Sequence, residues 1–213
     1  QWLVAAYPTQ EWANAIFKDM PEDQAYTKLY EAILTACRVS ADNDPAAEWK
    51  EHNATLARQN DFLNAQDYSA LHFKNDLGTD ITVGLVEGHQ WGGGAKPALN
   101  GVTFNANMPT EESFTTPDRF RVDGRVYNSI ALNNNDRIID QFWLEFKDGL
   151  VVDFDAQVGK DALDKLLSTD ENSKRIGEVA LVSYDSPISN MGILFLNTLF
   201  DENASCHIAL GQG

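Results

Sequence analysis

The hydrophobic pattern of the chain changes from a helical period to a strand period between residues 60 and 70, and this change limits the possible folds. Apolar residues in Glu22–Cys37 recur at three- and four-residue steps, which predicts an amphipathic helix. Asp44–Gln59 has the same spacing, and Asp44 is of a type that caps helix N-termini. From Ala70 on, short apolar runs are separated by turn residues, which is typical of strands. We therefore predict an α+β (mixed α/β) fold with N-terminal helices followed by a strand-rich half.

The predicted domain division follows the same change of period. We expect residues 1–60 to form a helical segment that completes an N-terminal region, and residues 61–213 to form a strand-rich domain.

Lys147-Asp-Gly149 predicts a hairpin turn, because glycine adopts the positive φ that such turns need. Continuous apolar runs predict buried strands, and a stretch rich in proline and asparagine predicts a shaped loop. The strands are expected at Trp2–Tyr7, Ile176–Val182 and Ile193–Leu196, and the loop at Phe104–Pro117.

The composition argues against membranes and nucleic acids as partners. No apolar stretch in the 213 residues approaches the roughly 18–20 residues that a spanning helix needs. The 16 basic and 32 acidic residues give a formal charge of −16, which repels a phosphate backbone and favours cationic groups or metal ions as ligands. Cys37 and Cys206 are too few for a disulfide scaffold, so we expect a reduced, intracellular setting.

Several histidines allow more than one interpretation. His52 continues the apolar stripe of its predicted helix, so packing explains it better than metal binding does. His89 and Trp91 lie in a glycine-rich stretch that is either an exposed turn, the favoured interpretation, or part of a substrate cleft. The pair Cys206-His207 is compatible with a thiol peptidase, but residues adjacent in sequence rarely reach the geometry of a nucleophile and its base.

Three acidic spots stand beside apolar or backbone-constraining residues. They are Glu111-Glu112, Glu178, and the segment from Glu202 to His207. Divalent metal sites combine carboxylates with imidazole nitrogens, and this is the mixture supplied by Glu112, Glu178, Glu202 and His207. Only the tertiary fold could assemble such a site, because these residues are far apart in the sequence. The alternative for each carboxylate is a solvated or salt-bridged position, which is least favourable for Glu178 because an apolar run follows it.

Four motifs occur in a fixed order along the chain. They are Asn107-Met-Pro-Thr-Glu-Glu-Ser-Phe-Thr115, Gly177-Glu-Val-Ala-Leu-Val182, Ser186-Pro-Ile-Ser189 and Leu199-Phe-Asp-Glu-Asn-Ala-Ser-Cys-His-Ile-Ala-Leu-Gly211. Together they resemble the motifs of the thermophilic-type metalloaminopeptidases, the family of aminopeptidase T, aminopeptidase S and PepS. The resemblance spans nearly all of this chain but only the middle half of a family member, so we expect further site residues beyond Gly213.

The resemblance implies a cytoplasmic, usually dimeric enzyme that removes N-terminal residues from peptides with two divalent metal ions. Zinc or cobalt are the expected ions, with manganese and magnesium as further candidates. Glu112 resembles a metal ligand and Glu178 the carboxylate shared by the two ions, while Glu202 and His207 match further metal-binding positions. The implied mechanism is metal-assisted hydrolysis by an activated water. Glu111 and Glu178 are the expected catalytic residues, and Glu111 is a candidate for passing a proton to the leaving amine.

Two other functions stay open at this point. A catalytically incomplete fragment would act only in binding or dimer assembly, because some ligands of the family lie beyond Gly213. A glycoside hydrolase with two working carboxylates would cleave its substrate without a metal. Metal content and the cleavage of a leucyl amide separate these alternatives from an aminopeptidase.

Overall fold

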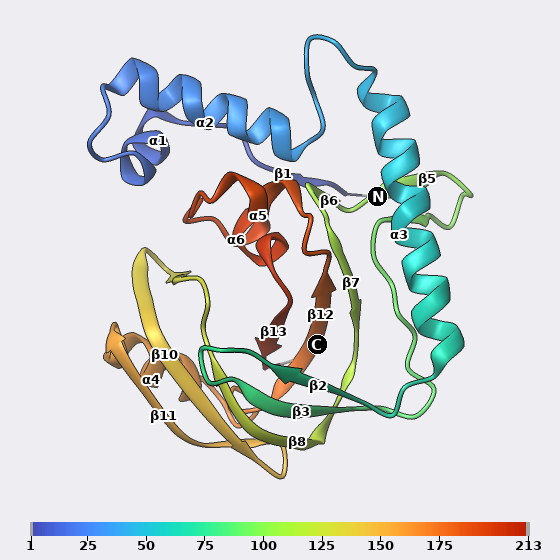
Figure 1. Cartoon of the computed structure of the whole chain (residues 1–213), viewed down its shortest axis with the longest axis vertical. Coiled ribbons are helices and arrows are strands. Elements are labelled where there is room, and N and C mark those ends of the chain that lie inside the picture. The colour runs from blue at the N-terminus through green and yellow to red at the C-terminus, as the bar shows by residue number, and fades with distance from the viewer. Residues whose placement is uncertain (1, 212–213) are drawn as a thin grey trace. The chain divides into compact units, whose positions relative to one another are not determined.

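The computed structural model describes residues 2–211, where helices and strands are both abundant (Figure 1). The helices are α1 (Gln10–Ile16), α2 (Glu22–Ala36), α3 (Pro45–Gln66), α4 (Lys160–Leu167), α5 (Pro187–Met191), α6 (Thr198–Asp201) and the short 3-10 helix η1 (Glu202–Ala204). The strands are β1 (Val4–Ala5), β2 (Ala70–Lys74), β3 (Asp80–Leu85), β4 (Ala95–Pro97), β5 (Thr103–Asn105), β6 (Asn107–Met108), β7 (Glu112–Thr115), β8 (Pro117–Tyr127), β9 (Leu132–Asn134), β10 (Arg137–Lys147), β11 (Leu150–Val158), β12 (Ile176–Val182) and β13 (His207–Leu210). This content confirms the predicted α+β class.

The chain forms two compact units, each built from separate stretches of sequence. The first unit contains the stretch through Asp61 together with Gly92–Ser113 and Leu181–Cys206. The second contains Phe62–Trp91, Phe114–Ala180 and the stretch from His207 onward. The division expected between residues 60 and 61 stays a prediction. Within residues 2–211, no helix is both long enough and apolar enough to cross a bilayer.

Helices α1 and α2 of the first unit form where the sequence predicts them, and they pack against each other (Figure 1). The Thr9 side chain caps α1 by accepting a hydrogen bond from the Trp12 N–H at 3.2 Å. Helix α2 buries the apolar stripe that periodicity assigns to its inner face. The buried residues are Ala25, Leu29, Ala32, Ile33 and Ala36. The helical period alone was therefore sufficient to identify this face.

Helix α3 begins as predicted and ends later than predicted. The Asp44 carboxylate accepts a hydrogen bond from the Ala46 N–H at 3.0 Å, so Asp44 caps the first turn. The helix continues past the predicted end at Gln59 to Gln66, because no glycine or proline interrupts it. The chain leaves the helix at Asp67, whose φ of 47° is left-handed.

The second unit is built on a six-stranded sheet whose main path has the order β11-β10-β8-β3-β2, with β9 paired to β10. All of these pairings are antiparallel. The turn that joins β10 to β11 contains Asp148 and Gly149, whose φ values of 49° and 75° confirm the predicted hairpin. Helix α4 packs on β10 and β11 (Figure 1) and buries Leu163 and Leu167.

A separate three-stranded sheet has the order β13-β12-β7. Strand β12 has the bounds predicted for it, because its apolar run ends at turn residues on both sides. It pairs antiparallel with β13, so that Ala180 lies opposite His207 and Glu178 opposite Ala209. Strand β7 begins at Glu112, inside the stretch predicted to be a loop. The prediction missed β5, β6 and β7 because strands of two to four residues are too short to show a period.

Two predicted buried strands are wrong. Ile193–Leu196 is irregular, and the Asp201 carboxylate accepts from the Phe195 N–H at 2.7 Å in place of a ladder partner. Burial of this carboxylate raises the pKa of Asp201, against the lowering effect of the backbone hydrogen bonds. In Trp2–Tyr7, only β1 is a strand, and Val4 is 46% exposed. An apolar run thus predicts burial only where another element covers it.

The turn at Gly149 generates a stability prediction with a matched control. Gly149 and Gly88 have nearly the same left-handed φ, +75° and +74°, but a Cβ at Gly149 would lie 1.9 Å from the Arg119 carbonyl oxygen, while Gly88 has open space. Gly88→Ala should lower the free energy of unfolding by about 1–2 kcal/mol, the cost of a left-handed L-residue. Gly149→Ala should lower it by roughly 1–3 kcal/mol more, because the backbone must move. Denaturant unfolding measures both, and equal losses would contradict the clash.

Candidate metal centre

Glu178 and His207 lie on adjacent antiparallel strands, β12 and β13. His207 is opposite Ala180, and Glu178 stands two residues before Ala180, so alternation places both side chains on one face of the sheet. The His207 Nε2 atom is 3.9 Å from Glu178 Oε1. Both side chains are half-buried. The strand pairing therefore presents one carboxylate and one imidazole side by side.

Glu112 adds a second carboxylate to this pair. One ligand atom from each of Glu112, Glu178 and His207 lies within 4.8 Å of the others. Glu112 is buried, at 6% exposure, and begins strand β7. Carboxylate oxygens and an imidazole nitrogen are suitable donors for a zinc-like divalent ion. The structure therefore brings together three of the four predicted ligands as a group that could hold a metal ion.

Glu202, the fourth predicted ligand, does not belong to the group formed by Glu112, Glu178 and His207. It begins η1 directly after α6 and is half-buried. Within residues 2–211, the group of ligand atoms that could hold a metal does not include Glu202. Its role as a ligand stays a prediction.

Glu111, the predicted proton carrier, is engaged in a buried ion pair. Its carboxylate accepts two hydrogen bonds from the Arg38 guanidinium, Nη1 to Oε1 at 2.5 Å and Nη2 to Oε2 at 2.9 Å. Only 5% of the Glu111 side chain and 18% of the Arg38 side chain are exposed. Such a two-pronged pair fixes the orientation of the carboxylate as well as its charge.

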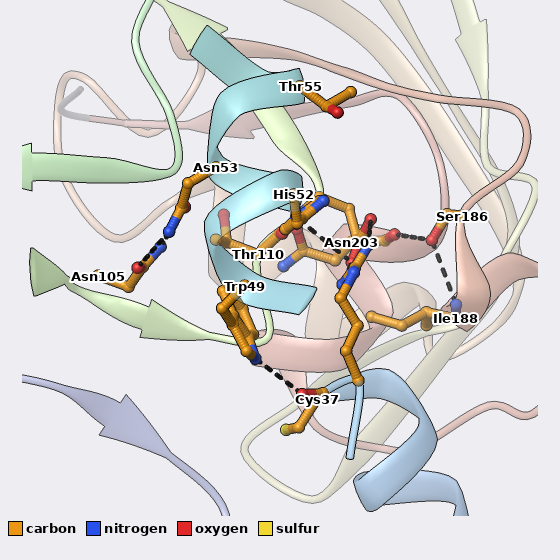
Figure 2. Close-up of polar contacts among 12 residues, drawn as sticks. Cys37, Trp49, His52, Asn53, Thr55, Asn105, Thr110, Ser186, Ile188 and Asn203 are labelled. Carbon is orange, nitrogen blue, oxygen red and sulfur yellow. Dashed lines mark hydrogen bonds and ion pairs between the residues drawn. The ribbon is translucent and has the colours of Figure 1, made fainter. Parts of the chain in front are cut away.

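Side chains from distant parts of the sequence bind the backbone of Thr110, which Figure 2 labels beside His52 and Asn203, and the backbone of Glu111. The Nε2 atom of His52 lies 2.7 Å from the Thr110 carbonyl oxygen, which can only accept, so Nε2 carries the hydrogen. Burial lowers the pKa of His52, and the nearby Arg38 charge lowers it further, while Glu111 and the bond to Thr110 oppose this. The Glu111 N–H donates to Asn203 Oδ1 at 2.7 Å.

Asn203 is itself held in place by two further hydrogen bonds. Its Nδ2 group donates to the Leu199 carbonyl at 2.9 Å, which assigns Oδ1 to the Glu111 N–H. Its own carbonyl accepts from the Ser186 hydroxyl at 2.9 Å, a contact visible in Figure 2. Asn203 and Ser186 are fully buried. The first, third and fourth of the four sequence motifs are therefore joined by a polar network.

Sequence reasoning assigned no role to Arg38 or Asn203, and treated His52 as a packing residue. For Asn203 a signal existed, since it lies inside the Glu-Asn-Ala-Ser-Cys-His segment that was singled out for its neighbours. For Arg38 there was none, because it follows a helix that periodicity describes as structural. Packing describes His52 only in part, because its ring edge lies against Trp49 while Nε2 binds Thr110.

Two further sequence interpretations can be compared with the structure. His89 and Trp91 are buried and contact each other edge to face, so the favoured interpretation as an exposed turn is wrong. The Cys206 sulfur contacts the backbone of Val182, accepting from its N–H at 3.5 Å and donating to its carbonyl at 3.6 Å. These contacts explain the position of the thiol without a catalytic role.

Comparison with known proteins adds independent findings. A family model described as "Thermophilic metalloprotease (M29)" matches residues 1–213. The chain is 49% identical over 211 residues to "Aminopeptidase 2" of Geobacillus stearothermophilus and 46% identical over 211 residues to "Aminopeptidase T" of Thermus aquaticus, covering 99% of this chain and 51% of each relative. The structure of wild-type AmpT from Thermus thermophilus matches with a TM-score of 0.93 and 43% identity over 100% of this chain and 51% of that one. The chain thus spans about half the length of the relatives it matches.

The strand arrangement predicts how the Zn²⁺ affinity responds to loss of one imidazole. His207→Gln should weaken Zn²⁺ binding by about 100-fold or more, because even partners of metal ligands contribute about 10–100-fold. His72→Gln is the matched control, since His72 is exposed and pairs with Asp80 at 2.8 Å. Competition with a chelator gives both constants. An unchanged affinity in His207→Gln would exclude His207 as a ligand.

Proposed function

Because the chain belongs to the thermophilic metalloprotease (M29) family, we propose that it is part of a metal-dependent aminopeptidase that hydrolyses the N-terminal peptide bond of peptides. The observation that carries the proposal is the group formed by Glu112, Glu178 and His207. The relatives are named as aminopeptidases, and these names support the reaction type.

The chemistry of this group fits a divalent ion. Two carboxylates with oxygens within 4.8 Å of each other repel, and one of them, Glu112, is buried. A buried carboxylate is costly unless a cation or hydrogen-bond donors compensate its charge. A divalent cation held by the two carboxylates and the imidazole would relieve that repulsion. Three protein ligands also suit a catalytic site, because coordination positions are left open for substrate and water.

We assign the metal-holding roles to the side chains as follows. Glu112, Glu178 and His207 would hold one ion, and by resemblance to the family Glu178 and Glu202 would help to hold a second. Zinc or cobalt suit the imidazole ligand, with manganese and magnesium as alternatives. A bound divalent ion supplies Lewis-acid polarisation of the scissile carbonyl and lowers the pKa of water.

The protein's own residues provide charge and orientation for the reaction. The formal charge of −16 favours the cationic α-ammonium group at the free N-terminus of a peptide. Glu178 is half-buried and would act in the reaction through the ions that it holds, because a carboxylate shared by two ions cannot also carry a proton. By resemblance to the family we also propose a cytoplasmic homodimer.

The proposal predicts a large effect of Glu178→Gln in the intact protein. Loss of the shared carboxylate should lower metal occupancy and slow leucyl-amide cleavage by about 10³-fold, or roughly 4 kcal/mol of barrier. Glu48→Gln, an exposed position on α3, is the matched control and should change the rate by less than about tenfold. Circular dichroism verifies the fold of both variants.

Two results would contradict the proposed function. Near-normal metal content and turnover in a well-folded Glu178→Gln variant would exclude this residue from the site. An intact protein with neither bound metal nor leucyl-amide cleavage would favour a module that acts only in binding or assembly.

A further inference from the structure

We infer that Arg38 and His52 are positioning residues that set the place of Glu112 by holding the two residues before it, Thr110 and Glu111. Together with Asn203 they form what we call the Glu111 clamp. The inference rests on the proposed role of Glu112 as a metal ligand. It goes beyond that role because none of the three clamp residues belongs to the group that could hold a metal.

The clamp acts on a segment with irregular backbone. Thr110 and Glu111 belong to no strand, and β7 begins only at Glu112. The Thr110 carbonyl accepts from His52 at 2.7 Å, and the Glu111 N–H donates to Asn203 at 2.7 Å. Side chains therefore satisfy the polar backbone groups that a ladder would satisfy within a sheet. The entry of the chain into Glu112 depends on them.

Arg38 fixes the side chain that immediately precedes the ligand. Its two nitrogens bind both oxygens of Glu111, and a rigid guanidinium fork restrains the carboxylate in plane and in distance. A lysine at this position would keep the charge but lose the second prong. Because Glu111 and Glu112 share a peptide bond, a displacement of the Glu111 backbone would also displace the backbone of Glu112.

Arg38 is itself anchored by the ends of two helices. It follows the C-cap of α2 with a left-handed φ of 56°, and its carbonyl accepts from Asn43 Nδ2 at 3.0 Å. Trp49 on α3 donates from Nε1 to the Cys37 carbonyl at 2.8 Å, as Figure 2 shows, and the Arg38 guanidinium lies 5.8 Å from the Trp49 ring centre. These contacts fix the backbone of Cys37 and Arg38, and so they restrict the positions that the Arg38 guanidinium can reach.

Asn203 connects the clamp to a second proposed ligand. It is the residue after Glu202, and its amide is oriented by Leu199, while its carbonyl accepts from Ser186. One buried side chain thus ties the Glu111 backbone to the helical turn that carries Glu202. The clamp holds the segments of Glu112 and Glu202 in a fixed relation within the first unit.

The bidentate pair also bears on the predicted role of Glu111 in proton transfer. Both of its oxygens accept from Arg38, so carrying a proton would require this buried pair to break. We therefore assign Glu111 to positioning and not to proton transfer. In this assignment the two adjacent glutamates have different roles. Glu112 binds the metal, and Glu111 holds Glu112 in position.

Metal affinity separates positioning from a purely electrostatic effect of Arg38. If Arg38 acted only through its charge, Arg38→Gln would remove a repelling cation and tighten Zn²⁺ binding. If it positions Glu112, Arg38→Gln should weaken Zn²⁺ binding despite the lost repulsion. Arg38→Lys should also weaken it, by about tenfold or more, with the charge unchanged. The two mechanisms therefore predict changes of opposite sign in the Zn²⁺ affinity of Arg38→Gln. For Arg38→Lys they predict changes of different size.

The experiment measures Zn²⁺ affinity by chelator competition in the intact protein, with the visible spectrum of the Co²⁺ form as a record of ligand geometry. Arg58→Gln is the matched control, because Arg58 is an exposed arginine that pairs with Glu51 on the same helix. We expect weaker Zn²⁺ binding and an altered Co²⁺ spectrum in Arg38→Lys and Arg38→Gln, and no change in Arg58→Gln. In leucyl-amide cleavage, kcat should fall more than KM rises.

His52 offers a second, independent pair of variants. His52→Gln retains an N–H donor at a reach similar to Nε2, so it should restore most of the Zn²⁺ affinity. His52→Leu removes the donor and leaves the Thr110 carbonyl without its partner, so binding should weaken by about tenfold. This pair decides the question even if Arg38→Gln fails to fold.

Several results would overturn the inference. Zn²⁺ affinity and Co²⁺ spectra that stay at wild-type values in Arg38→Lys and His52→Leu, with only the Tm lowered, would show that the clamp is merely structural. Tighter Zn²⁺ binding in Arg38→Gln would show an effect of charge alone. A wild-type protein that binds Zn²⁺ but cleaves no leucyl amide would contradict the proposed activity, while the Zn²⁺ affinities of the variants would still test the clamp.

Discussion

Two glutamates that are adjacent in the sequence are both buried. The free-energy cost of burying two carboxylates requires compensating groups from the segments that surround them. Glu111 and Glu112 are 5% and 6% exposed. A buried carboxylate is tolerated when opposite charge or several donors surround it. Glu111 meets this requirement through Arg38, and a ligand atom of Glu112 lies within 4.8 Å of those of Glu178 and His207. Glu111 is thus bound by a cation, while Glu112 lies in the group that could hold a metal ion.

The clamp on Glu111 gives a role in the site to the N-terminal segment of the first unit, which periodicity describes as purely structural. The turn that follows α2 contains Arg38, and α3 contains His52. The apolar faces of the helices pack as periodicity predicts, while Arg38, just after α2, binds Glu111 and His52 of α3 binds the Thr110 carbonyl. Helix α3 therefore both packs in the core and carries a positioning residue. The positioning role lies in one or two side chains, whose removal need not disturb the hydrophobic stripe.

Features that depend on local spacing were predicted well. The buried stripe of α2, the bounds of β12 and the turn at Gly149 each follow from residues within a few positions of one another. Ile193–Leu196 failed as a strand because an apolar run does not reveal whether a ladder partner exists. Here the Asp201 carboxylate takes the backbone N–H groups that a neighbouring strand would otherwise bind.

The sequence by itself determined the helical stripes, the hairpin turn and, through the resemblance of its motifs, the identity of the candidate ligands. Only the tertiary structure brought Glu112, Glu178 and His207 into one group that could hold a metal ion, while Glu202 lies outside that group. It also decided that Glu111 is clamped, since its partners Arg38 and Asn203 lie 73 and 92 positions away. Contacts of that separation leave no periodic trace in the chain, because they are selected by the geometry of the folded backbone and by the need to compensate buried charge.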